Sequence, residues 1–497
     1  MQVLFRVDSS ANIGSGHFMR CLTLAKAFHH LTQCAIHFIA KEILIHHETL
    51  LAENQFLLTK LPPNLHIAAD AQHSIASFDI QLGPNVVVVD HYQLDQSWET
   101  PVREHCAHLL VIDDLANRIH DCDSLLDQTY LRHKNDYRHL VSPKTNLLLG
   151  CDYSLLRREF IELREHAVKK RMSKDGIREI LICFGSTDPI NATSQTLDAI
   201  LPICIEHQIK INIVLSSSAP HLLEISERVA NSSLCTLHVD STAVAKLMLD
   251  ADLAIGANGT LSWERCCLGL PAITTDIAAN QVFVGKALAQ TGAIVHLGQV
   301  DSGFATRLKQ TFEQLLQANT AYLSQMVNQA FALVDGKGAQ KVIQHILQSR
   351  VALRPATLDD TDLLFAWQSN PEVRKYSRNP KPVEFNEHVL WLRNTLANSK
   401  RALFIIIDSW TKSGVGMLRL DQISELELEI SILVAPEHQG AGYADAAIHA
   451  LDKSFKRKTI HAYLDPKNLK SSKLFARAGF KAIHVDHFVR FPDLRGD

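Results

Sequence analysis

A histidine stands directly behind a glycine-rich turn near the start of the chain. In VDSSANIGSGHFMRCLTLAKAF, residues 7–28, His17 follows Gly14 and Gly16 at the point where an apolar strand pattern becomes a helical one. Such glycines let the backbone approach a ligand, and a helix N-terminus favours an anion and disfavours a second positive charge on imidazole. A neutral histidine is a competent general base. By itself, the motif is equally compatible with a histidine that only hydrogen-bonds the helix end.

A second polar cluster occurs in GANGTLSWERCCLGLPAITTDIAANQ, residues 256–281. It combines a turn that opens one helix, a carboxylate one turn into that helix, and an amide pair at the start of the next helix. The candidate binding residues are Asn258, Gly259, Thr260, Glu264, Asn280 and Gln281. A helix N-terminus binds phosphate oxygens, and a carboxylate accepts hydrogen bonds from both ribose hydroxyls. The cluster therefore predicts a nucleotide-diphosphate site, with a surface glutamate beside a tight turn as the alternative.

Further polar side chains follow other strands of the first 150 residues. They lie at or just after strand ends, which face the ligand crevice of an open α/β sheet. These residues are Asp8, Asp90, His91, Tyr92, Asp113 and Asp114. We expect them to contact a sugar or to orient His17, and a structural role is the alternative.

Another glycine-rich turn lies near the C-terminus, in LELEISILVAPEHQGAGYADAAIHAL, residues 426–451. An apolar strand is followed by a short run that opens a helix. That run is Gln439, Gly440, Ala441, Gly442, Tyr443 and Ala444. Successive backbone N–H groups in such a turn bind a pyrophosphate.

The pattern of the chain places these residues on three domains. Short apolar runs, typical of buried parallel strands, alternate with helical periods in residues 1–165 and again in 166–348. The charged segment 156–176 is expected to hold a helix and a hinge. Hairpin-like neighbours after residue 351 predict a mixed or antiparallel sheet over 351–497. The fold class is therefore α/β, with two Rossmann-like domains followed by a third, smaller α/β domain.

Composition excludes several functional classes. Of the 497 residues, 46% are hydrophobic and 21% are charged, and the net charge is -3, which argues against a nucleic-acid coat or a basic membrane patch. The ten cysteines include no CxxC pair, and the histidines show no HExxH spacing, so we expect neither a disulfide framework nor a bound metal. The strand-like start and the absence of a long apolar run predict a cytoplasmic protein without membrane contact. The oligomeric state stays open.

The first 345 residues resemble a family of enzymes. The motifs IGSGHFMRCLTLA, VVDHYQLDQSWE, VIDDLANR, CDYSLLRREF, FGSTDP and VDGKGAQ, together with the 256–281 segment, are similar to the UDP-sugar hydrolase of pseudaminic acid biosynthesis. The resemblance implies a glycosyltransferase-B-like pair of Rossmann domains and the removal of UDP from UDP-2,4-diacetamido-2,4,6-trideoxy-β-L-altropyranose with inversion. It also implies that His17 is the general base.

The C-terminal domain resembles the GNAT superfamily of acetyl-CoA-dependent N-acetyltransferases. The motifs LRPATLDD, QGAGYA and NLKSSKLFARAGF, which begins at Asn468, carry the resemblance. It implies acetyl-CoA as co-substrate, bound by the turn 439–444, by Asn468 and by the backbone from Leu433 to Ala435, where the strand splays from its neighbour. Phe475 replaces the tyrosine that protonates the leaving thiolate in many members, so Tyr463 or Tyr443 is the candidate acid. Glu429 or a water chain is the candidate base.

The fusion constrains the substrates. In pseudaminic acid synthesis a GNAT-type enzyme acetylates the 4-amino group of UDP-4-amino-4,6-dideoxy-N-acetyl-β-L-altrosamine, and the hydrolase acts on the product. The chain is therefore expected to perform two consecutive steps on nucleotide sugars. Two alternatives remain: a glycosyltransferase fused to an acetyltransferase, and a sensor that binds nucleotide sugars without turnover.

Overall fold

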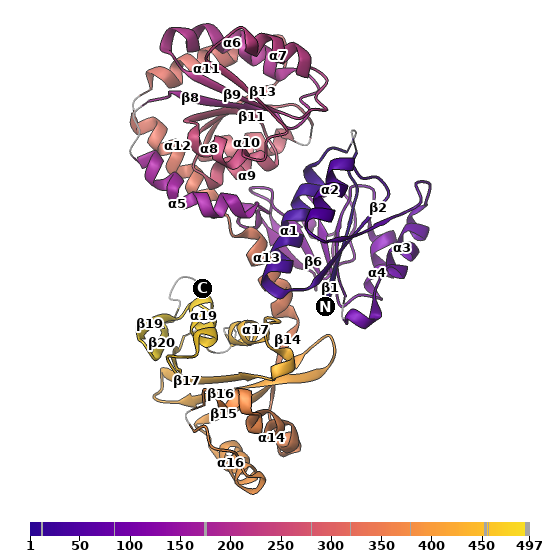
Figure 1. Ribbon diagram of the computed structural model, residues 1–497, viewed down its shortest axis with the longest axis vertical. Helices are drawn as coiled ribbons and strands as arrows, with labels where there is room; N and C mark the ends of the chain where they lie inside the picture. Colours follow the sequence, from indigo (N-terminus) through magenta and orange to yellow (C-terminus); the bar gives the residue numbers. More distant parts are fainter. Residues whose placement is uncertain are drawn as a thin grey trace. The chain divides into compact units, whose positions relative to one another are not determined.

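The computed structural model describes most of the chain: residues 1–10, 13–83, 85–172, 176–279, 281–318, 320–377, 379–451, 455 and 457–492. These residues divide into two compact units. One unit comprises residues 1–27 and 35–342, and the other comprises 28–34 and 343–497. The first unit contains two parallel sheets and the second unit contains a mixed sheet (Figure 1). The α/β fold class is confirmed, whereas the boundaries expected near residues 165 and 348 stay predictions.

The first sheet is parallel throughout, in the order β3-β2-β1-β4-β5-β6-β7. Its strands are β1 (Gln2–Val7), β2 (Ala35–Ala40), β3 (Leu57–Lys60), β4 (Asn85–Asp90), β5 (His108–Ile112), β6 (Ser124–Asp127) and β7 (Asn146–Leu149). Both β1 and β4 are buried along their whole length, which explains their near-continuous apolar sequences. The accompanying helices are α1 (Gly16–Thr32), α2 (Ile45–Glu53), α3 (Ile67–Ala76) and α4 (Gln96–Arg103).

The strand order decides where a ligand site forms. Because β1 lies between β2 and β4, the chain leaves β1 toward one side of the sheet and leaves β4 toward the other. The loops after these two strands therefore diverge and open a crevice at their carboxyl ends. Asp90 ends β4, and His17 lies in the helix that follows the loop after β1, 73 residues away in sequence.

The second sheet repeats this plan in the order β10-β9-β8-β11-β12-β13. Its strands are β8 (Glu179–Cys183), β9 (Lys210–Leu215), β10 (Cys235–Val239), β11 (Leu253–Ala257), β12 (Ala272–Asp276) and β13 (Ile294–Gln299). The helices are α5 (Arg158–Met172), α6 (Ala192–His207), α7 (Leu222–Ala230), α8 (Val244–Asp250), α9 (Thr260–Cys267), α10 (Gln281–Thr291), α11 (Phe304–Gln317), α12 (Thr320–Leu333) and α13 (Gly338–Ser349). Helices cover both faces: α6, α7 and α11 lie on one side, and α8, α9 and α10 on the other (Figure 1). Its crevice lies between the loops after β8 and β11.

The segment expected to hold a helix and a hinge contains α5. Phe160 and Ala167 of this helix are buried in one core of the second sheet, together with Leu181 and Trp263. The helix therefore packs as part of the second half. Residues 173–175 lie outside the described part of the chain.

The third sheet is antiparallel except for one parallel pair, β17 with β18, in the order β14-β15-β16-β17-β18-β20-β19. Its strands are β14 (Val351–Pro355), β15 (Arg401–Asp408), β16 (Ser413–Gln422), β17 (Glu427–Val434), β18 (Thr459–Tyr463), β19 (Lys481–His484) and β20 (His487–Arg490). The helices are α14 (Thr361–Ser369), α15 (Pro371–Arg374), α16 (Phe385–Ala397), α17 (Tyr443–Ala450) and α19 (Leu469–Arg477). Helices α14 and α16 cover one face, and α17 and α19 cover the other (Figure 1).

Two searches of the described residues bear on other classes of function. None of their helices combines the length and the apolar character that crossing a bilayer requires. The same residues hold no group of three or more His, Cys, Asp or Glu side chains arranged to bind a metal ion.

A buried histidine beside the first crevice predicts a pH-dependent stability. His47 is 1% exposed, stacks on Phe18 at 4.0 Å between ring centroids and shares a 2.8 Å hydrogen bond with Ser9. Burial, with a smaller contribution from His46, lowers the pKa of His47 from 6.5 to about 4. As the pH falls, the unfolded chain therefore binds the proton first, so stability is complete above pH 6.5 and decreases toward pH 4.

We expect protonation of His47 to lower the free energy of unfolding by on the order of 1–3 kcal/mol as the pH falls from 6.5 toward 4. Denaturant unfolding at pH 7 and pH 5 measures the difference. The difference in unfolding free energy between pH 7 and pH 5 should shrink in a His47→Gln variant. It should stay unchanged in His105→Gln, where the substituted histidine is exposed. Equal pH dependence in the parent and His47→Gln would contradict the assignment.

Candidate functional site

The turn before α1 places His17 at the edge of the first sheet. Gly14 has a φ of +81°, a conformation that glycine adopts without strain, and its N–H donates to the Ser10 carbonyl at 2.8 Å. Gly16 begins the helix, so His17 lies in the first turn of α1. The sequence-derived position of the histidine at a strand-to-helix turn is therefore observed.

A carboxylate from the neighbouring strand holds the imidazole. Asp90, the last residue of β4, contacts Nδ1 of His17 at 2.6 Å and also binds Arg20 at 2.5 and 2.6 Å. Burial alone would raise the pKa of Asp90, but the positive charge of Arg20 and the hydrogen bonds from Arg20 and His17 outweigh it and hold the pKa well below its ordinary value. Nη2 of Arg20 also lies 3.0 Å from Nδ1, but the carboxylate is closer, and because an ionised carboxylate can only accept hydrogen bonds, its 2.6 Å contact favours a proton on Nδ1. In the neutral imidazole, Nε2 then keeps the lone pair that a general base needs.

A second carboxylate fixes the other neighbours of His17. Tyr92 meets the imidazole edge-on at 4.5 Å and donates its hydroxyl to Asp114 at 2.8 Å, while Arg20 donates to the same carboxylate at 2.9 Å. Burial, followed by the charge of Asp114, raises the pKa of Tyr92 above its ordinary value. The phenol therefore stays protonated and acts as a donor.

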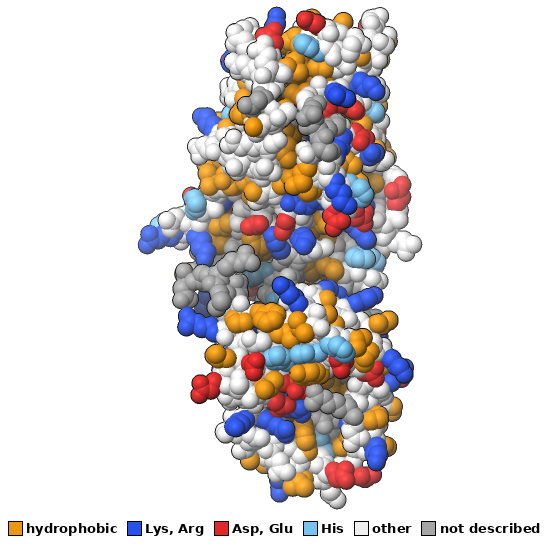
Figure 2. Space-filling model, turned by 90° about the vertical axis from the view of Figure 1, so that its left-hand side faces the viewer, with side chains coloured by type: hydrophobic (Ala, Val, Ile, Leu, Met, Phe, Trp, Pro, Cys, Tyr) orange, Lys and Arg blue, Asp and Glu red, His pale blue; other side chains and the backbone are white. Residues whose placement is uncertain are grey.

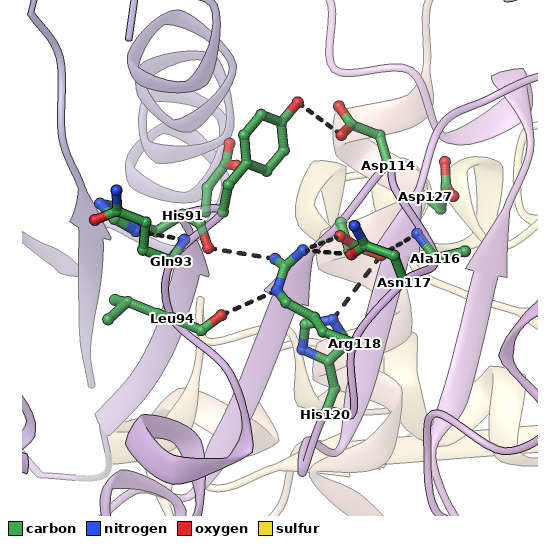
Figure 3. Close-up of polar contacts among 12 residues, drawn as sticks. His91, Gln93, Leu94, Asp114, Ala116, Asn117, Arg118, His120 and Asp127 are labelled. Carbon is green, nitrogen blue, oxygen red and sulfur yellow. Dashed lines mark hydrogen bonds and ion pairs between the residues drawn. The ribbon is translucent and has the colours of Figure 1, made fainter. Parts of the chain in front are cut away.

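Asp113 and Asp8 have supporting positions behind these groups. Arg118 donates to Asp113 at 2.8 Å and to the carbonyls of Leu94 and His91 at 3.1 and 3.3 Å, which ties together the loops after β4 and β5 (Figure 3). Asp8 is 5% exposed and binds Arg6 at 2.5 Å. It also contacts His91 at 3.1 Å. The structure thus places both carboxylates in the buried scaffold that holds the loops.

A cavity of about 470 Å³ lies in front of His17 within the first unit. Its walls come from both sheets. The lining side chains and glycines that bear on the chemistry are His17, Arg20, Tyr92, Asp114, Gln128, Thr129, Arg132, Gly259, Thr260, Trp263, Gln281 and Phe283. The candidate base and the opening turns of α9 and α10 therefore face one space.

Arg132 is a lining residue that the sequence did not single out. Its Nε donates to the buried Asp127 at 2.5 Å, and its guanidinium lies 5.5 Å from the ring centroid of Phe283. Arg20 was missed as well, although its position three residues after His17 places both on one helix face. For Arg132 no sequence signal existed, because the loop after β6 carries no recognisable motif.

The expected nucleotide-binding residues divide into two groups. Gly259, with a φ of +143°, and Thr260 open α9 at the cavity, and Gln281 begins α10 there. Asn258 is instead buried beside the cavity wall and donates to Asp276 at 2.9 Å. Asn280 lies outside the described residues.

Glu264 is not one of the residues that line the cavity. It is 8% exposed, and its carboxylate lies 3.5 Å from Nη2 of Arg157. Burial raises the pKa of Glu264, and the charge of Arg157 opposes the increase. The carboxylate is therefore a buried acceptor one turn into α9, next to the helix end that faces the cavity.

The third sheet shows the geometry expected of a cofactor cleft. Strand β17 pairs with β18 only as far as Ile430 and Ala462, yet β17 continues along β16 to Val434. The two strands therefore separate beyond that point, as the resemblance to the acetyltransferases led us to expect. Leu433 and Ala435 lie on this diverging segment, and the Gln439 side chain donates to the Val434 carbonyl at 3.2 Å.

The turn after β17 fits a pyrophosphate. Gly440 and Gly442 have φ values of +82° and +85°, and a Cβ added to Gly440 would have no atom within 4 Å. Tyr443 begins α17, but its own hydroxyl is buried and donates to Asp408 at 2.7 Å. Burial alone would raise the pKa of Asp408, but hydrogen bonds from Arg350 and Tyr443 lower it to about 2.

The remaining expected residues of this domain occupy three kinds of position. Asn468 caps α19 by accepting from the Ser471 N–H at 3.1 Å. Phe475 is in the core, 5.0 Å from the Phe480 ring. Tyr463 is 44% exposed and stacks on His487 at 4.4 Å, so its hydroxyl has the more open surroundings of the two candidate acids.

Two family models match separate parts of the chain. Residues 350–481 match the model described as "Acetyltransferase (GNAT) domain". Residues 180–334 match a model described as a protein of unknown function.

Individual relatives cover both parts. An uncharacterized protein of Methanocaldococcus jannaschii is 25% identical over 97% of this chain and 97% of its own length. The UDP-2,4-diacetamido-2,4,6-trideoxy-beta-L-altropyranose hydrolase of Campylobacter jejuni is 26% identical over 59% of this chain and 97% of its own. The acetyltransferase PseH of the same organism is 23% identical over 25% of this chain and 78% of its own.

Among solved structures, MurG of Acinetobacter baumannii covers 70% of this chain and 99% of its own, with a TM-score of 0.50 and 17% sequence identity. This likeness supports a glycosyltransferase-B-like fold for the paired Rossmann domains. Together, the comparisons support a chain that joins a segment similar to a UDP-sugar hydrolase to a C-terminal GNAT acetyltransferase domain.

Proposed function

We propose that the protein is a bifunctional enzyme of pseudaminic acid biosynthesis. Its C-terminal domain acetylates the 4-amino group of UDP-4-amino-4,6-dideoxy-N-acetyl-β-L-altrosamine with acetyl-CoA. Its N-terminal two thirds then hydrolyse UDP-2,4-diacetamido-2,4,6-trideoxy-β-L-altropyranose to UDP and the free sugar. The names of two relatives, one for each part, support this pairing.

The observation that carries the hydrolase proposal is the contact of His17 with the ionised Asp90 at the wall of the cavity. His17 Nε2 takes a proton from a water molecule while the water oxygen attacks the anomeric carbon, and the bond from that carbon to the UDP oxygen breaks. Asp90 stabilises the resulting imidazolium. Because the water approaches opposite the leaving UDP, the configuration at the anomeric carbon inverts.

In the proposed complex, the leaving group lies between the opening turn of α9 and Arg132. The N–H groups that open α9 and the guanidinium of Arg132 supply positive potential for the pyrophosphate. Arg20 is paired with two carboxylates, Asp90 and Asp114, whereas Arg132 is paired, within the described residues, with Asp127 alone, so the role of Arg20 in this proposal is to hold its two carboxylates. Gln281 is placed to donate to a phosphate or sugar oxygen.

Acetyl transfer follows from the splay of β17 and β18. In the proposed complex, the pantetheine arm pairs with the backbone around Leu433 and Ala435, and the turn 439–444 binds the pyrophosphate. The amine nitrogen then attacks the thioester carbonyl, the C–N bond forms and the C–S bond breaks. Positioning of the two reactants supplies much of the acceleration.

One experiment tests both activities in order. The full chain is incubated with acetyl-CoA and the UDP-4-amino sugar, and mass analysis follows the acetylated UDP-sugar, UDP and the free diacetamido sugar over time. We expect the acetylated UDP-sugar to appear first and UDP afterwards. UDP release without any acceptor alcohol favours hydrolysis over the glycosyltransferase alternative, and any turnover excludes a sensor. Substrate that stays intact would refute the proposal.

A prediction for Glu264 follows from its place one turn inside α9. In the proposed complex its carboxylate accepts hydrogen bonds from the ribose, which is common to UDP and to every UDP-sugar. Glu264→Ala should therefore weaken UDP binding about 10–100-fold, as the loss of a charge-assisted hydrogen bond implies. Calorimetry with UDP measures the change, with Glu162→Ala, an exposed glutamate of α5, as the control. Parent-like affinity of the Glu264 variant would remove this residue from the site.

A further inference from the structure

One face of the third sheet is polar over β17, β18 and β20. Leu428, Ile430, Ile460, Ala462 and Phe488 point to the other face, where they are buried with residues of α17 and α19. The alternating residues therefore share the opposite face. These include Glu427, Glu429, His461, Tyr463 and His487. In Figure 2 histidine side chains gather in a row on the lower part of the molecule, the part that holds the third sheet in Figure 1.

Two histidines of this face are in direct contact. Nδ1 of His461 lies 3.0 Å from Nε2 of His487, and the two rings stack at an interplanar angle of 18°. Nε2 of His461 is buried, has no hydrogen-bond partner within the described residues, and lies 3.8 Å from Oε1 of Glu427. The three groups therefore form a chain of carboxylate, imidazole and imidazole.

The carboxylate decides where the protons of this chain lie. A negative charge beside Nε2 of His461 favours a proton on that nitrogen, so in the neutral ring Nδ1 is an acceptor. His487 must then donate from Nε2. This leaves the lone pair on Nδ1 of His487, at the end of the chain remote from Glu427.

The series of side chains from Glu427 through His461 to His487 leads toward the point where β17 and β18 separate. His461 lies opposite Glu429 where β17 and β18 are still paired, and the pairing ends one residue later, at Ala462. His487 lies opposite Tyr463, the next residue of β18, and stacks on its ring at 4.4 Å. The free lone pair is therefore on the histidine nearer to the point where the strands separate.

We propose that His487 is the catalytic base of acetyl transfer, and that His461 and Glu427 are positioning residues that hold it in the accepting tautomer; the inference rests on the proposed acetyltransferase function. The acceptor arrives as an ammonium and gives one proton to Nδ1 of His487. The amine attacks the thioester carbonyl, the C–N bond forms, and the C–S bond breaks. The second amine proton goes to the CoA thiolate, directly or through the Tyr463 hydroxyl. The products are the amide, CoA as the thiol, and a protonated His487 that solvent deprotonates.

Several charged groups surround the histidine pair. Glu427 and Glu429 lie on β17, on the same face of the sheet. From the turn between β19 and β20, Asp486 interacts with His487 through its charge, and it also binds the exposed His484 at 2.7 Å.

The test measures CoA thiol release by the full-length protein with acetyl-CoA and the UDP-4-amino sugar between pH 6 and pH 9. In His487→Gln, kcat at pH 7 should fall about 10²-fold, and the deficit should shrink toward pH 9 because more of the amine arrives unprotonated. The KM for acetyl-CoA should stay unchanged. His461→Ala should cost about tenfold, and His461→Gln should recover part of this loss because its amide oxygen still accepts from His487.

Two controls separate the possible failures. His105→Gln changes an exposed histidine of the first unit and should keep the parent rate. A parent-like affinity for acetyl-CoA, measured by calorimetry with the same variants, shows that the acetyltransferase domain is folded. A parent-like kcat of His487→Gln at pH 7 would overturn this inference alone. A parent protein that releases no thiol with this sugar would overturn the proposed acetyltransferase function together with it.

Discussion

Replacing His17 with glutamine should reduce UDP release from the diacetylated UDP-sugar by about 10²–10⁴-fold, the range expected for loss of a general base. Glutamine keeps a donor for Asp90 and a similar size, so the ion pair of Asp90 with Arg20 has no reason to break. The cavity should therefore still bind UDP. The initial rate of UDP formation at saturating substrate measures the effect.

Two matched measurements make this result specific. Acetyl transfer by His17→Gln should match the parent, because His17 belongs to the first unit and the proposed acetyltransferase residues belong to the second. Asp90→Asn should also be slow, since an amide can donate as well as accept and no longer requires the proton on Nδ1. UDP release by His17→Gln within a few-fold of the parent would show that His17 is only a helix-end residue and would exclude it as the base.

The second large effect is expected from the glycine turn of the acetyltransferase. In Gly440→Val/Gly442→Val, the added side chains occupy the space beside the turn, and the backbone cannot hold φ near +80° without strain. Losing two charge-assisted hydrogen bonds to a pyrophosphate, at about 1.5–3 kcal/mol each, weakens acetyl-CoA binding at least about 10²-fold. Calorimetry with acetyl-CoA measures the loss.

The control for this variant is Gly479→Val. Gly479 has a φ of +82° in the same domain, where it follows α19, so the substitution causes a similar strain outside the turn 439–444. It should lower stability and leave acetyl-CoA affinity near the parent value. If both variants lose affinity equally, the turn has no special role in binding.

The same variant tests the order of the two reactions. We expect the hydrolase to reject the 4-amino sugar, because a protonated amine brings a charge that an amide-shaped pocket cannot solvate. Gly440→Val/Gly442→Val should therefore release no UDP from the amino sugar, even with acetyl-CoA present, and should release it normally from the diacetylated UDP-sugar. Rapid UDP release from the amino sugar without acetyl-CoA would refute this order.

Local patterns were sufficient for the elements and for the turns. The apolar runs that become β1 and β4 are long enough and uniform enough to indicate buried parallel strands. The glycines before His17 and before Tyr443 were recognisable because a turn into a helix leaves backbone N–H groups exposed and requires residues that tolerate positive φ. Both facts depend on neighbours in the sequence, so they can be deduced without a structure.

The partners of these residues depend on which strands lie side by side. Asp90 was one of several polar residues at strand ends, and only the adjacency of β1 and β4 places it against His17. Arg132 follows β6 of the first sheet and Phe283 lies in α10 beside the second sheet, and their contact could not be deduced from either segment. Likewise, His461 and His487 are 26 residues apart and meet because β18 pairs with β20. Sequence periodicity describes one strand or helix at a time, whereas the order of strands in a sheet is set by packing across the whole core. For this reason the sequence determined the candidate base and the cofactor turn. The groups that orient these residues were decided by the tertiary structure alone.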